Sequence, residues 1–313
     1  MNVYLIDGNS YYYRAYHAVR GLSNAKGFPT NALYGFTSML LRIIRERKPD
    51  ALAIAFDTPA PTGRHRMYEE YKAQRPEMPH DLSVQIPYIK EIVRAFRIPS
   101  FELPGYEADD IICTLARKAA AEGAEVFIVT GDKDMLQAVS DGVRIYDPMK
   151  DLVIDAQQVE ERFGLSPERI PEIMALTGDA VDNIPGVKGI GEKTAKELLR
   201  EAGSLDELLA HPEKIRNERL RRLIQDGRES IELSRALATI DTSVPVEANL
   251  RDLHSAEPDW PALLALFSEF EFKSFIRIIP SHGYEPRGEY EAITDRGRLL
   301  AFLRGEDRGK DTR

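Results

Sequence analysis

Nine carboxylates fall in five short clusters of this chain, and four of the clusters lie at or just beyond an apolar run. They are Asp7, Asp57, Glu107, Asp109, Asp110, Asp132, Asp134, Asp179 and Asp182. Ligands of a doubly wound sheet collect at the carboxyl ends of its strands, so we expect these acids to converge. Converging carboxylates need cations, and hard divalent ions such as Mg²⁺ or Mn²⁺ take oxygen ligands. The pattern therefore favours a metal-dependent enzyme that acts on phosphate groups.

Three acids within four residues, Glu107, Asp109 and Asp110, form the strongest local signal. Pro104 and Gly105 predict a turn before them, which places the acids at the entry and first turn of a helix. The helix dipole favours an acid there by about 0.3–1 kcal/mol, and one acid can cap the helix. Mutual repulsion of three acids exceeds that gain unless a cation is bound. Each of the other clusters, taken alone, fits a turn or a solvated surface as well as a site.

The elements that must position these acids alternate between strand and helix over residues 1–150. The apolar runs predict strands at 2–7, 51–57, 99–103 and 125–130, and helical spacing predicts helices at 31–47, 82–97, 107–122 and 133–140. This alternation is typical of an α/β fold with a mostly parallel sheet flanked by helices. The Pro-rich stretch 58–81 is long for a plain loop, and such loops are usually functional or mobile.

Beyond residue 155 the pattern becomes helical. Helices are predicted near 156–163, 168–177, 191–202, 204–210, 215–226 and 229–239. After an apolar segment that closes at Ile279, residues 281–289 have the composition of a linker. Within residues 290–313 the pattern predicts one short strand and one helix, which could not bury a core by themselves. We therefore expect this end to be the truncated start of a following domain, or a tail.

Composition restricts the class of protein. The 313 residues are 43% hydrophobic and 30% charged, as in an ordinary globular protein. No apolar run approaches the roughly 18–20 residues of a membrane span, and the N-terminus has no signal-peptide pattern. Cys113 is the single cysteine, so no intrachain disulfide can form, and we expect it to be an inert buried thiol. These features indicate a cytoplasmic protein without a membrane partner.

The formal net charge of −9 does not exclude a nucleic-acid partner. The nine clustered acids equal this excess in number, and basic residues are locally dense between Arg42 and Arg75. A local basic surface is sufficient for binding a phosphate backbone.

Seven motifs in a fixed order carry a family resemblance. They are LIDGNS (5–10), YRAYH (13–17), AFD (55–57), YKAQRP (71–76), GYEADD (105–110), TGDKD (130–134) and GDAVDNIPG (178–186). With them, about residues 1–280 of the chain closely resemble the 5′ nuclease domain of bacterial DNA polymerase I, in the flap endonuclease superfamily. The resemblance implies a PIN-like 5′ nuclease fold with a helical arch and a C-terminal helical region that contains a helix–hairpin–helix.

The resemblance also implies roles for the acids and for the arch. One metal ion would be held around Asp7, Asp57, Glu107 and Asp109, and a second around Asp132, Asp134, Asp179 and Asp182. Asp109 would lie between the two ions and Asp110 would support them. The stretch 58–81 would be the arch beside which a 5′ flap passes, with Lys72 and Arg75 contacting the scissile phosphate. Two Mg²⁺ or Mn²⁺ ions would stabilise the attacking and leaving oxygens.

A Gly-rich turn at 186–195 precedes a predicted helix but matches neither a Rossmann fingerprint nor a P-loop. It resembles a helix–hairpin–helix, at about 185–203, whose backbone N–H groups hold a phosphate of duplex DNA. Including the arch, the implied DNA contacts are Arg14, Lys72, Arg75, Gly186, Lys188, Gly189, Gly191, Lys193 and Thr194. A monovalent cation such as K⁺ would bind at the same hairpin.

These inferences predict a structure-selective 5′ nuclease, a 5′–3′ exonuclease and flap endonuclease, that serves primer removal in replication and DNA repair. Residues 1–175 would form the metal-binding core and 176–280 the helical DNA-binding region. The expected partners are flapped, nicked or branched duplex DNA and a polymerase domain in the same or a separate chain. We expect a monomer in the bacterial cytoplasm, associated with the nucleoid, and no polymerase activity from these residues.

Two other functions stay open. A non-catalytic DNA-binding module would use the hairpin and the arch alone, but it would lose several acids, and none is lost here. A PIN-type ribonuclease would use fewer acids, would be far shorter and would lack the arch and the hairpin.

Overall fold

The computed structural model describes residues 1–280, and its centre is a six-stranded sheet. In sheet order the strands are β3 (Ser100–Phe101), β2 (Ala51–Ala55), β1 (Asn2–Asp7), β4 (Glu125–Val129), β5 (Val143–Asp147) and β6 (Leu152–Ile154). The first five are parallel and β6 is antiparallel to β5. Asp7 is in register with Ala55, and Ile6 with Val129, so β1, β2 and β4 end at one edge of the sheet.

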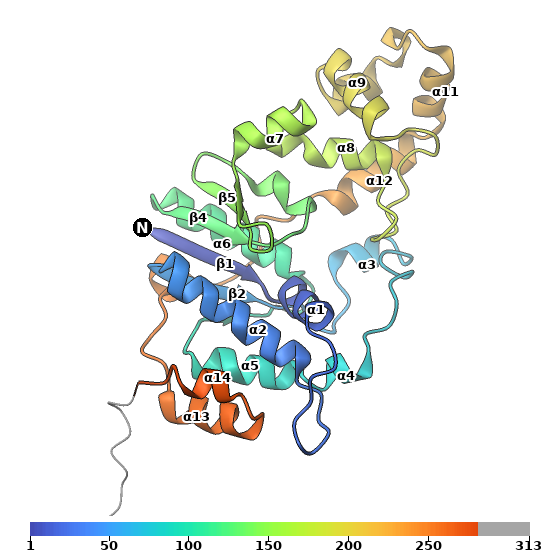
Figure 1. The fold of residues 1–313 in the computed structure, drawn as a ribbon. Helices are drawn as coiled ribbons and strands as arrows, with labels where there is room; N and C mark the ends of the chain where they lie inside the picture. The colour runs from blue at the N-terminus through green and yellow to red at the C-terminus, as the bar shows by residue number, and fades with distance from the viewer. Residues whose placement is uncertain (281–313) are drawn as a thin grey trace, which may run out of the picture.

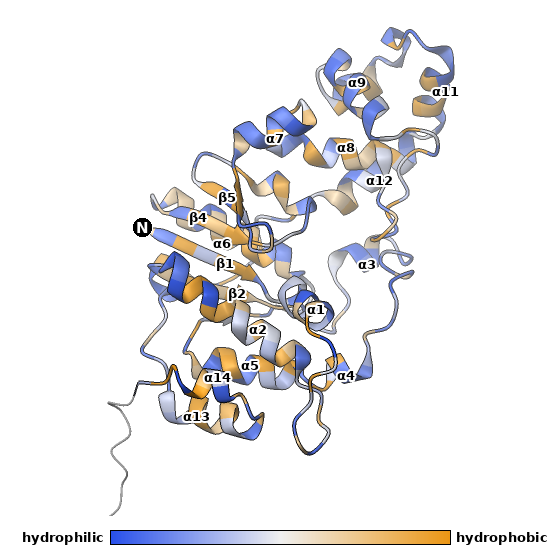
Figure 2. Cartoon of the chain, viewed as in Figure 1, coloured by the Kyte–Doolittle hydropathy of each residue, from blue (hydrophilic) through white to orange (hydrophobic). Residues whose placement is uncertain are grey.

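The strands form where the sequence is continuously apolar, because both faces of a parallel sheet are covered. Val3 and Leu5 of β1 face one apolar cluster, while Tyr4 and Ile6 face the other. The first cluster includes α6 (Ala108–Ala121), and the second includes α1 (Gly8–Ala18), α2 (Asn31–Arg42) and α5 (Ile86–Ala95). Figure 1 shows α2 and α5 on one side of the strands, and Figure 2 shows the hydrophobic colouring of the strands between the helical layers.

The predicted strands at 2–7, 51–57, 99–103 and 125–130 are confirmed, with slightly shorter bounds. The β5–β6 hairpin was not predicted. Its strands are short, and Arg144 interrupts the apolar run of β5, so the local pattern is weak. The helix predicted at 31–47 ends as α2 at Arg42 and continues as one π-helical turn, Ile43–Arg47. The helix predicted at 133–140 is the 3₁₀ helix η2 (Asp134–Ala138).

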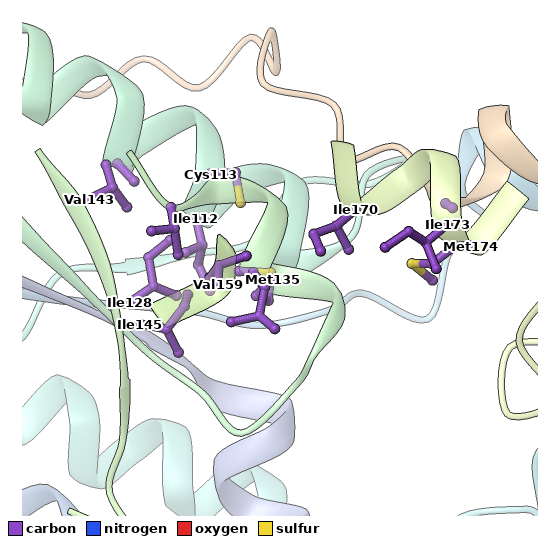
Figure 3. Packing of buried hydrophobic residues seen from close by; sticks show 14 of the residues in the cluster. Ile112, Cys113, Ile128, Met135, Val143, Ile145, Val159, Ile170, Ile173 and Met174 are labelled. Atoms are coloured by element: carbon purple, nitrogen blue, oxygen red, sulfur yellow. The ribbon is translucent and has the colours of Figure 1, made fainter. Parts of the chain in front are cut away.

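The helical second half agrees closely with prediction. Its α-helices are α7 (Ala156–Phe163), α8 (Ile170–Thr177), α9 (Glu192–Ala202), α10 (Leu205–Ala210), α11 (Glu218–Asp226) and α12 (Arg228–Ala238), with short 3₁₀ turns η3 (Pro167–Arg169), η4 (Pro212–Lys214) and η5 (Leu250–Leu253). The core continues from the sheet into this half. Figure 3 shows Ile128 and Ile145 facing Ile112 of α6, with Ile170 and Ile173 of α8 farther along the same cluster. Cys113 is buried in this cluster, as expected.

Two later helices, α13 (Trp260–Glu269) and α14 (Lys273–Ile276), return to the first half of the chain. Phe267 packs near Phe96, which follows α5, at 6.5 Å between ring centroids, and Phe275 stacks on Tyr34 of α2 at 4.7 Å. The predicted helical DNA-binding region, 176–280, therefore includes a segment that covers the α/β core instead. Figure 1 shows α13 and α14 below α5, far from α9 and α11.

The stretch 58–81 is less helical than the resemblance implied. It contains α3 (Gly63–Met67) and the start of α4 (His80–Ser83), and turns or irregular backbone fill the space between them. The predicted linker at 281–289 and the predicted segment 290–313 lie outside the described residues. Among residues 1–280, no helix has both the length and the apolar character needed to cross a membrane.

Candidate active site

The first two acids lie where neighbouring strands end. Asp7 caps α1, because its Oδ1 accepts from the Ser10 N–H at 2.9 Å, and its Oδ2 accepts from the Thr130 hydroxyl at 3.3 Å. Asp57 accepts from the Ala108 N–H at 2.7 Å and from the Asn9 side-chain amide at 2.7 Å. These bonds tie the ends of β1, β2 and β4 to the first turn of α6.

Glu107, Asp109 and Asp110 start α6, but they face different partners. Asp110 is buried, and its two oxygens accept from the two terminal nitrogens of Arg64, each at 2.8 Å. It also accepts from the N–H groups of Glu107 at 3.1 Å and Asp241 at 2.9 Å. The structure thus gives Asp110, predicted among the metal ligands, a complete set of protein partners. Asp110 therefore holds the Arg64 side chain in position.

Asp109 differs from its neighbours because no hydrogen bond or ion pair to its carboxylate is present in residues 1–280. Burial raises the pKa of Asp109 well above its ordinary value, and Asp7, Asp132 and Asp57 raise it further. Burial likewise raises the pKa of Asp7 to about 7, with Asp57 and Asp132 adding to the shift. Asp7, Asp57, Asp109 and Asp132 therefore lie close enough to raise one another's pKa, and the charge of Lys72 offsets this only in part at Asp109.

Asp132 and Asp134 lie on the turn after β4. The Asp132 N–H donates to the Thr130 hydroxyl at 3.1 Å, and the Asp134 N–H donates to the Asp132 carboxylate at 2.9 Å. The Oδ1 atom of Asp134 is buried and has no hydrogen-bond partner in the described part of the chain. Burial, with Asp132 second, raises the pKa of Asp134 to about 7.

Asp179 and Asp182 lie on a turn between α8 and α9. Asp179 accepts from Lys133 Nζ at 2.7 Å and from the Val181 N–H at 2.7 Å. Burial would raise the pKa of Asp179, but the bonds from Lys133 and the backbone outweigh it and hold the pKa below its ordinary value. Asp182 instead faces the arch, where Arg75 contacts it at 2.5 Å.

The arch presents its cations to the acids. Lys72 Nζ lies 2.9 Å from Glu107 and 3.7 Å from Asp182, and the Lys72 N–H donates to the Asp182 carbonyl at 3.0 Å. The buried Tyr71 hydroxyl donates to Asp182 at 3.2 Å. The backbone of Lys72 is in the left-handed region, with φ 58°, which is uncommon for residues other than Gly or Asn. The arch thus holds both predicted cations directly over the acid cluster.

Two adjoining cavities contain most of the predicted acids. Both cavities are lined by Lys72, Arg75, Glu107, Asp109 and Asp132. The first is also lined by Asp7, Asn9, Ser10, Tyr13, Asp57 and Ala108. The second is also lined by Arg64, Tyr71, Asp134, Met174, Asp182, Ile184, Leu237, Ala238 and Ile240. Asp109 thus borders both cavities, as Glu107 and Asp132 do, and its role between two ions stays a prediction. Asp179 lines neither cavity.

The donor set fits hard divalent cations. All of the donors are carboxylate oxygens, Asp134 carries a buried oxygen without a partner among the described residues, and burial, with neighbouring acids adding to it, raises the pKa values of Asp7, Asp109 and Asp134. Within residues 1–280 no group of three acids is arranged to hold a metal ion, and Lys72, Arg75 and Lys133 pair with Glu107, Asp182 and Asp179. Binding of a cation by Glu107 and Asp182 would require Lys72 and Arg75 to exchange partners.

Sequence reasoning missed the residues that orient the acids. Arg64, Thr130 and Lys133 each contact one or more of them, and Asn9 bridges to Asp57. Asn9 and Thr130 occur inside the quoted motifs, so their position beside an acid was the available signal. Arg64 lies 43 positions before Glu107, and nothing local connects the two.

The predicted DNA contacts outside the arch divide into two kinds. Lys188, Gly189, Gly191 and Lys193 are exposed at the turn before α9, and Thr194 is half-buried. Gly186 is buried, and its N–H donates to Ser234 at 2.9 Å, so that N–H is not free for a phosphate. Arg14 pairs with Asp147 at 3.3 Å. The Arg14 guanidinium also packs against Gly131, because a Cβ added to Gly131 would lie 1.7 Å from it. A basic residue not predicted, Arg219 of α11, reaches the Gly189 turn.

The chain's fold is that of the flap nucleases. It aligns with T5 5′-exonuclease bound to zinc with a TM-score of 0.66 at 20% identity, over 90% of this chain and all of that one. It also aligns with the catalytic core of Rad2 in complex with a DNA substrate, with a TM-score of 0.60 at 19% identity, over 86% and 88% of the two chains.

Sequence comparison supplies the family. Residues 2–164 match the 5′-3′ exonuclease N-terminal resolvase-like domain, and residues 165–261 match the 5′-3′ exonuclease C-terminal SAM fold. The chain belongs to the 5′–3′ exonuclease family and is a nuclease.

Two relatives illustrate the range of the family. The 5′-3′ exonuclease of Aquifex aeolicus is 44% identical over 275 residues, which cover 88% of this chain and 94% of that protein. The DNA polymerase I of Bacillus caldotenax is 44% identical over 286 residues, 90% of this chain but 32% of that protein. The chain thus spans about a third of its DNA polymerase I relatives, and the resemblance noted from the motifs is confirmed.

Proposed function

We propose that the chain hydrolyses DNA phosphodiesters near the junction of a 5′ flap and a duplex, with two divalent metal ions, Mg²⁺ or Mn²⁺, at the acid cluster. The observation that carries this proposal is Asp109, which lines both cavities and makes no ion pair of its own within residues 1–280. Relatives support it: the phage T5 flap endonuclease was crystallised in a complex with DNA and metal ions.

The proposed ligands follow the two cavities. Asp7, Asp57, Glu107 and Asp109 would hold one ion, and Asp109, Asp132, Asp134 and Asp182 the other. Asp110 and Asp179 would act through Arg64 and Lys133, which they already bind. Bound divalent ions would supply Lewis-acid stabilisation of charge on the reacting phosphate and lower the pKa of water.

The chain's own cations handle the substrate. Lys72 and Arg75 lie over the cavities and now neutralise Glu107 and Asp182. With divalent ions held by those carboxylates, Lys72 and Arg75 would be free to turn to the phosphate oxygens of a substrate without leaving a charge unpaired. Preorganised cations aimed at developing charge are worth more in such a partly enclosed site than in water.

Duplex DNA would be held away from the cavities, at the turn before α9. The N–H groups of Gly189 and Gly191 make no hydrogen bond within residues 1–280, and Lys188 and Lys193 are exposed beside them. Backbone N–H groups at a helix start bind phosphates without reading bases, so little sequence preference is expected. A monovalent cation such as K⁺, which the resemblance implies at this turn, belongs to the same proposal.

The cellular role follows from this chemistry. A nuclease that removes 5′ flaps serves primer removal and repair in the bacterial cytoplasm, on nucleoid DNA, and a polymerase supplies its substrate. We propose that the chain works as a monomer with such a polymerase, fused or separate, because the polymerase I relatives join the two in one protein.

The experiment compares three fluorescent substrates: a 5′-flap duplex, the same duplex without a flap, and a single-stranded RNA. We expect Mg²⁺-dependent cutting of the flap substrate at the junction and little cutting of RNA. Cutting of RNA alone would favour a PIN-type ribonuclease. Tight binding of the flap duplex without any cutting would indicate a non-catalytic module.

A further inference from the structure

The turn that precedes α9 is fixed to helix α12 through Gly186. The Gly186 N–H donates to Ser234 Oγ at 2.9 Å, and Ser230 Oγ donates to the Gly186 carbonyl at 2.7 Å. Ser234 is completely buried. A Cβ added to Gly186 would lie 2.2 Å from the Gly178 nitrogen, so the backbone at Gly186 passes directly beside the backbone at Gly178. This contact closes the loop that carries Asp179 and Asp182. Both polar backbone groups of Gly186 are therefore held by α12.

The other end of α12 is fixed to the acid cluster. Arg64, which binds Asp110, also donates to the carbonyls of Leu237 at 2.9 Å and Thr239 at 2.8 Å. Gln137 donates to the Ala238 carbonyl and to the Asp134 carbonyl, each at 3.0 Å. The last carbonyls of α12, which have no partner inside the helix, thus hold the base of the arch and the segment of Asp134.

Between these two attachments α12 is an uninterrupted helix that packs along α8 (Figure 1). A helix rises about 1.5 Å per residue, so the five residues from Ser234 to Thr239 span roughly 7–8 Å. Because side-chain bonds hold both ends, this length cannot change without breaking them.

We propose that α12 is a rigid spacer which sets the distance between the duplex phosphate at the Gly189 turn and the acid cluster, and so selects the phosphodiester that is cut. Ser230 and Ser234 are its positioning residues. The inference rests on the proposed function and adds the device that determines the cleavage position. A merely structural role for the serines would lower cleavage of every substrate alike, whereas a spacer acts only on DNA that reaches both sites.

The test maps the cut site at single-nucleotide resolution on two 5′-flap substrates. One has a duplex long enough to reach the Gly189 turn and the other a duplex too short to reach it. The variants are Ser230→Ala and Ser234→Ala, with Ser230→Thr to keep the hydroxyl and Ala236→Ser, an exposed site on the same helix, as the matched control. If Ser234→Ala lowers the folded fraction, measured by thermal melting, the half-buried Ser230 position carries the comparison.

On the long duplex, the alanine variants should spread cutting to neighbouring phosphodiesters and lower the share of the main product several-fold. Their Kd for that duplex should change by less than about threefold, because the phosphate contacts remain. On the short duplex their products should equal those of the wild type, and Ser230→Thr should restore the single cut site. An unchanged cut site on the long duplex, or an equal loss on both duplexes, would overturn the spacer. A wild type that cuts neither substrate would instead contradict the proposed function.

Discussion

Asp7 and Asp134 carry charge that the folded chain compensates poorly. Burial raises the pKa of each to about 7, whereas an unfolded aspartate titrates near 3.9. Between these values the folded chain binds protons that the unfolded chain releases. Stability therefore rises as the pH falls through this window.

The chelated protein should consequently be more stable at pH 6 than at pH 8, by on the order of 1 kcal/mol for each of the two groups. Urea unfolding at the two pH values measures the difference. Asp134→Asn, which copies the neutral form, should raise stability at pH 8 and reduce the pH dependence, and the exposed Asp141→Asn should change neither. A chelated protein that loses stability between pH 8 and pH 6 would contradict the charge assignment.

Asp109 is the residue on which the proposed metal chemistry depends most. Asp109→Ala should slow flap cleavage by roughly a thousandfold or more, since metal stabilisation of the transition state is worth several kcal/mol. Flap binding should persist, because the basic surfaces are intact. Counting bound Mn²⁺ should show fewer ions per chain than in the wild type, with Asp141→Ala unchanged. Near wild-type turnover of the Asp109 variant in Mg²⁺ is the result that excludes this role.

The arch is the element that joins substrate entry to chemistry. Its Lys72 reaches Glu107 and Asp182 from a backbone held by the Asp182 carbonyl. Lys72→Ala should slow cleavage far more than it weakens duplex binding, because the ammonium acts on the scissile phosphate. Single-turnover rates and equilibrium binding separate the two effects, with the exposed Lys26→Ala as the control. Equal losses in rate and binding would reduce Lys72 to an anchor.

A substitution at the start of α9 should have the opposite effect to Lys72→Ala and weaken duplex binding more than it slows cleavage. Lys193→Ala should weaken duplex binding and lower the slope of log K against log salt by about one, because one phosphate contact is lost. Cleavage at saturating DNA should stay close to that of the wild type. An unchanged salt slope would mean that Lys193 does not contact the duplex.

At the scale of elements, the sequence predicted what local pattern determines. β1, β2 and β4 are continuous apolar runs with an acid at or near the end, so both the sheet edge and the site could be placed. The β5–β6 hairpin and the irregular backbone of the arch depend on tertiary contacts and left no clear pattern. The partners of Asp110 and Asp179 could not be predicted either, because Arg64 and Lys133 meet them only after folding.

The whole molecule reconciles a net charge of −9 with a DNA substrate. Acids are gathered in two adjoining cavities, while exposed lysines lie at a separate turn that α12 connects to them. Without divalent ions the cavities repel a phosphate backbone, but the separate basic turn does not depend on those ions. Binding and cutting should therefore respond differently to metal removal.

The decisive measurement for metal-dependent flap cleavage is single-turnover cutting of a 5′-flap duplex, recorded beside binding of the same DNA, in Mg²⁺ and in excess chelator. We expect a cut at the junction in Mg²⁺ that collapses in chelator and returns when Mg²⁺ or Mn²⁺ is added back, while duplex binding persists throughout. Cutting at an undiminished rate in chelator would contradict this expectation.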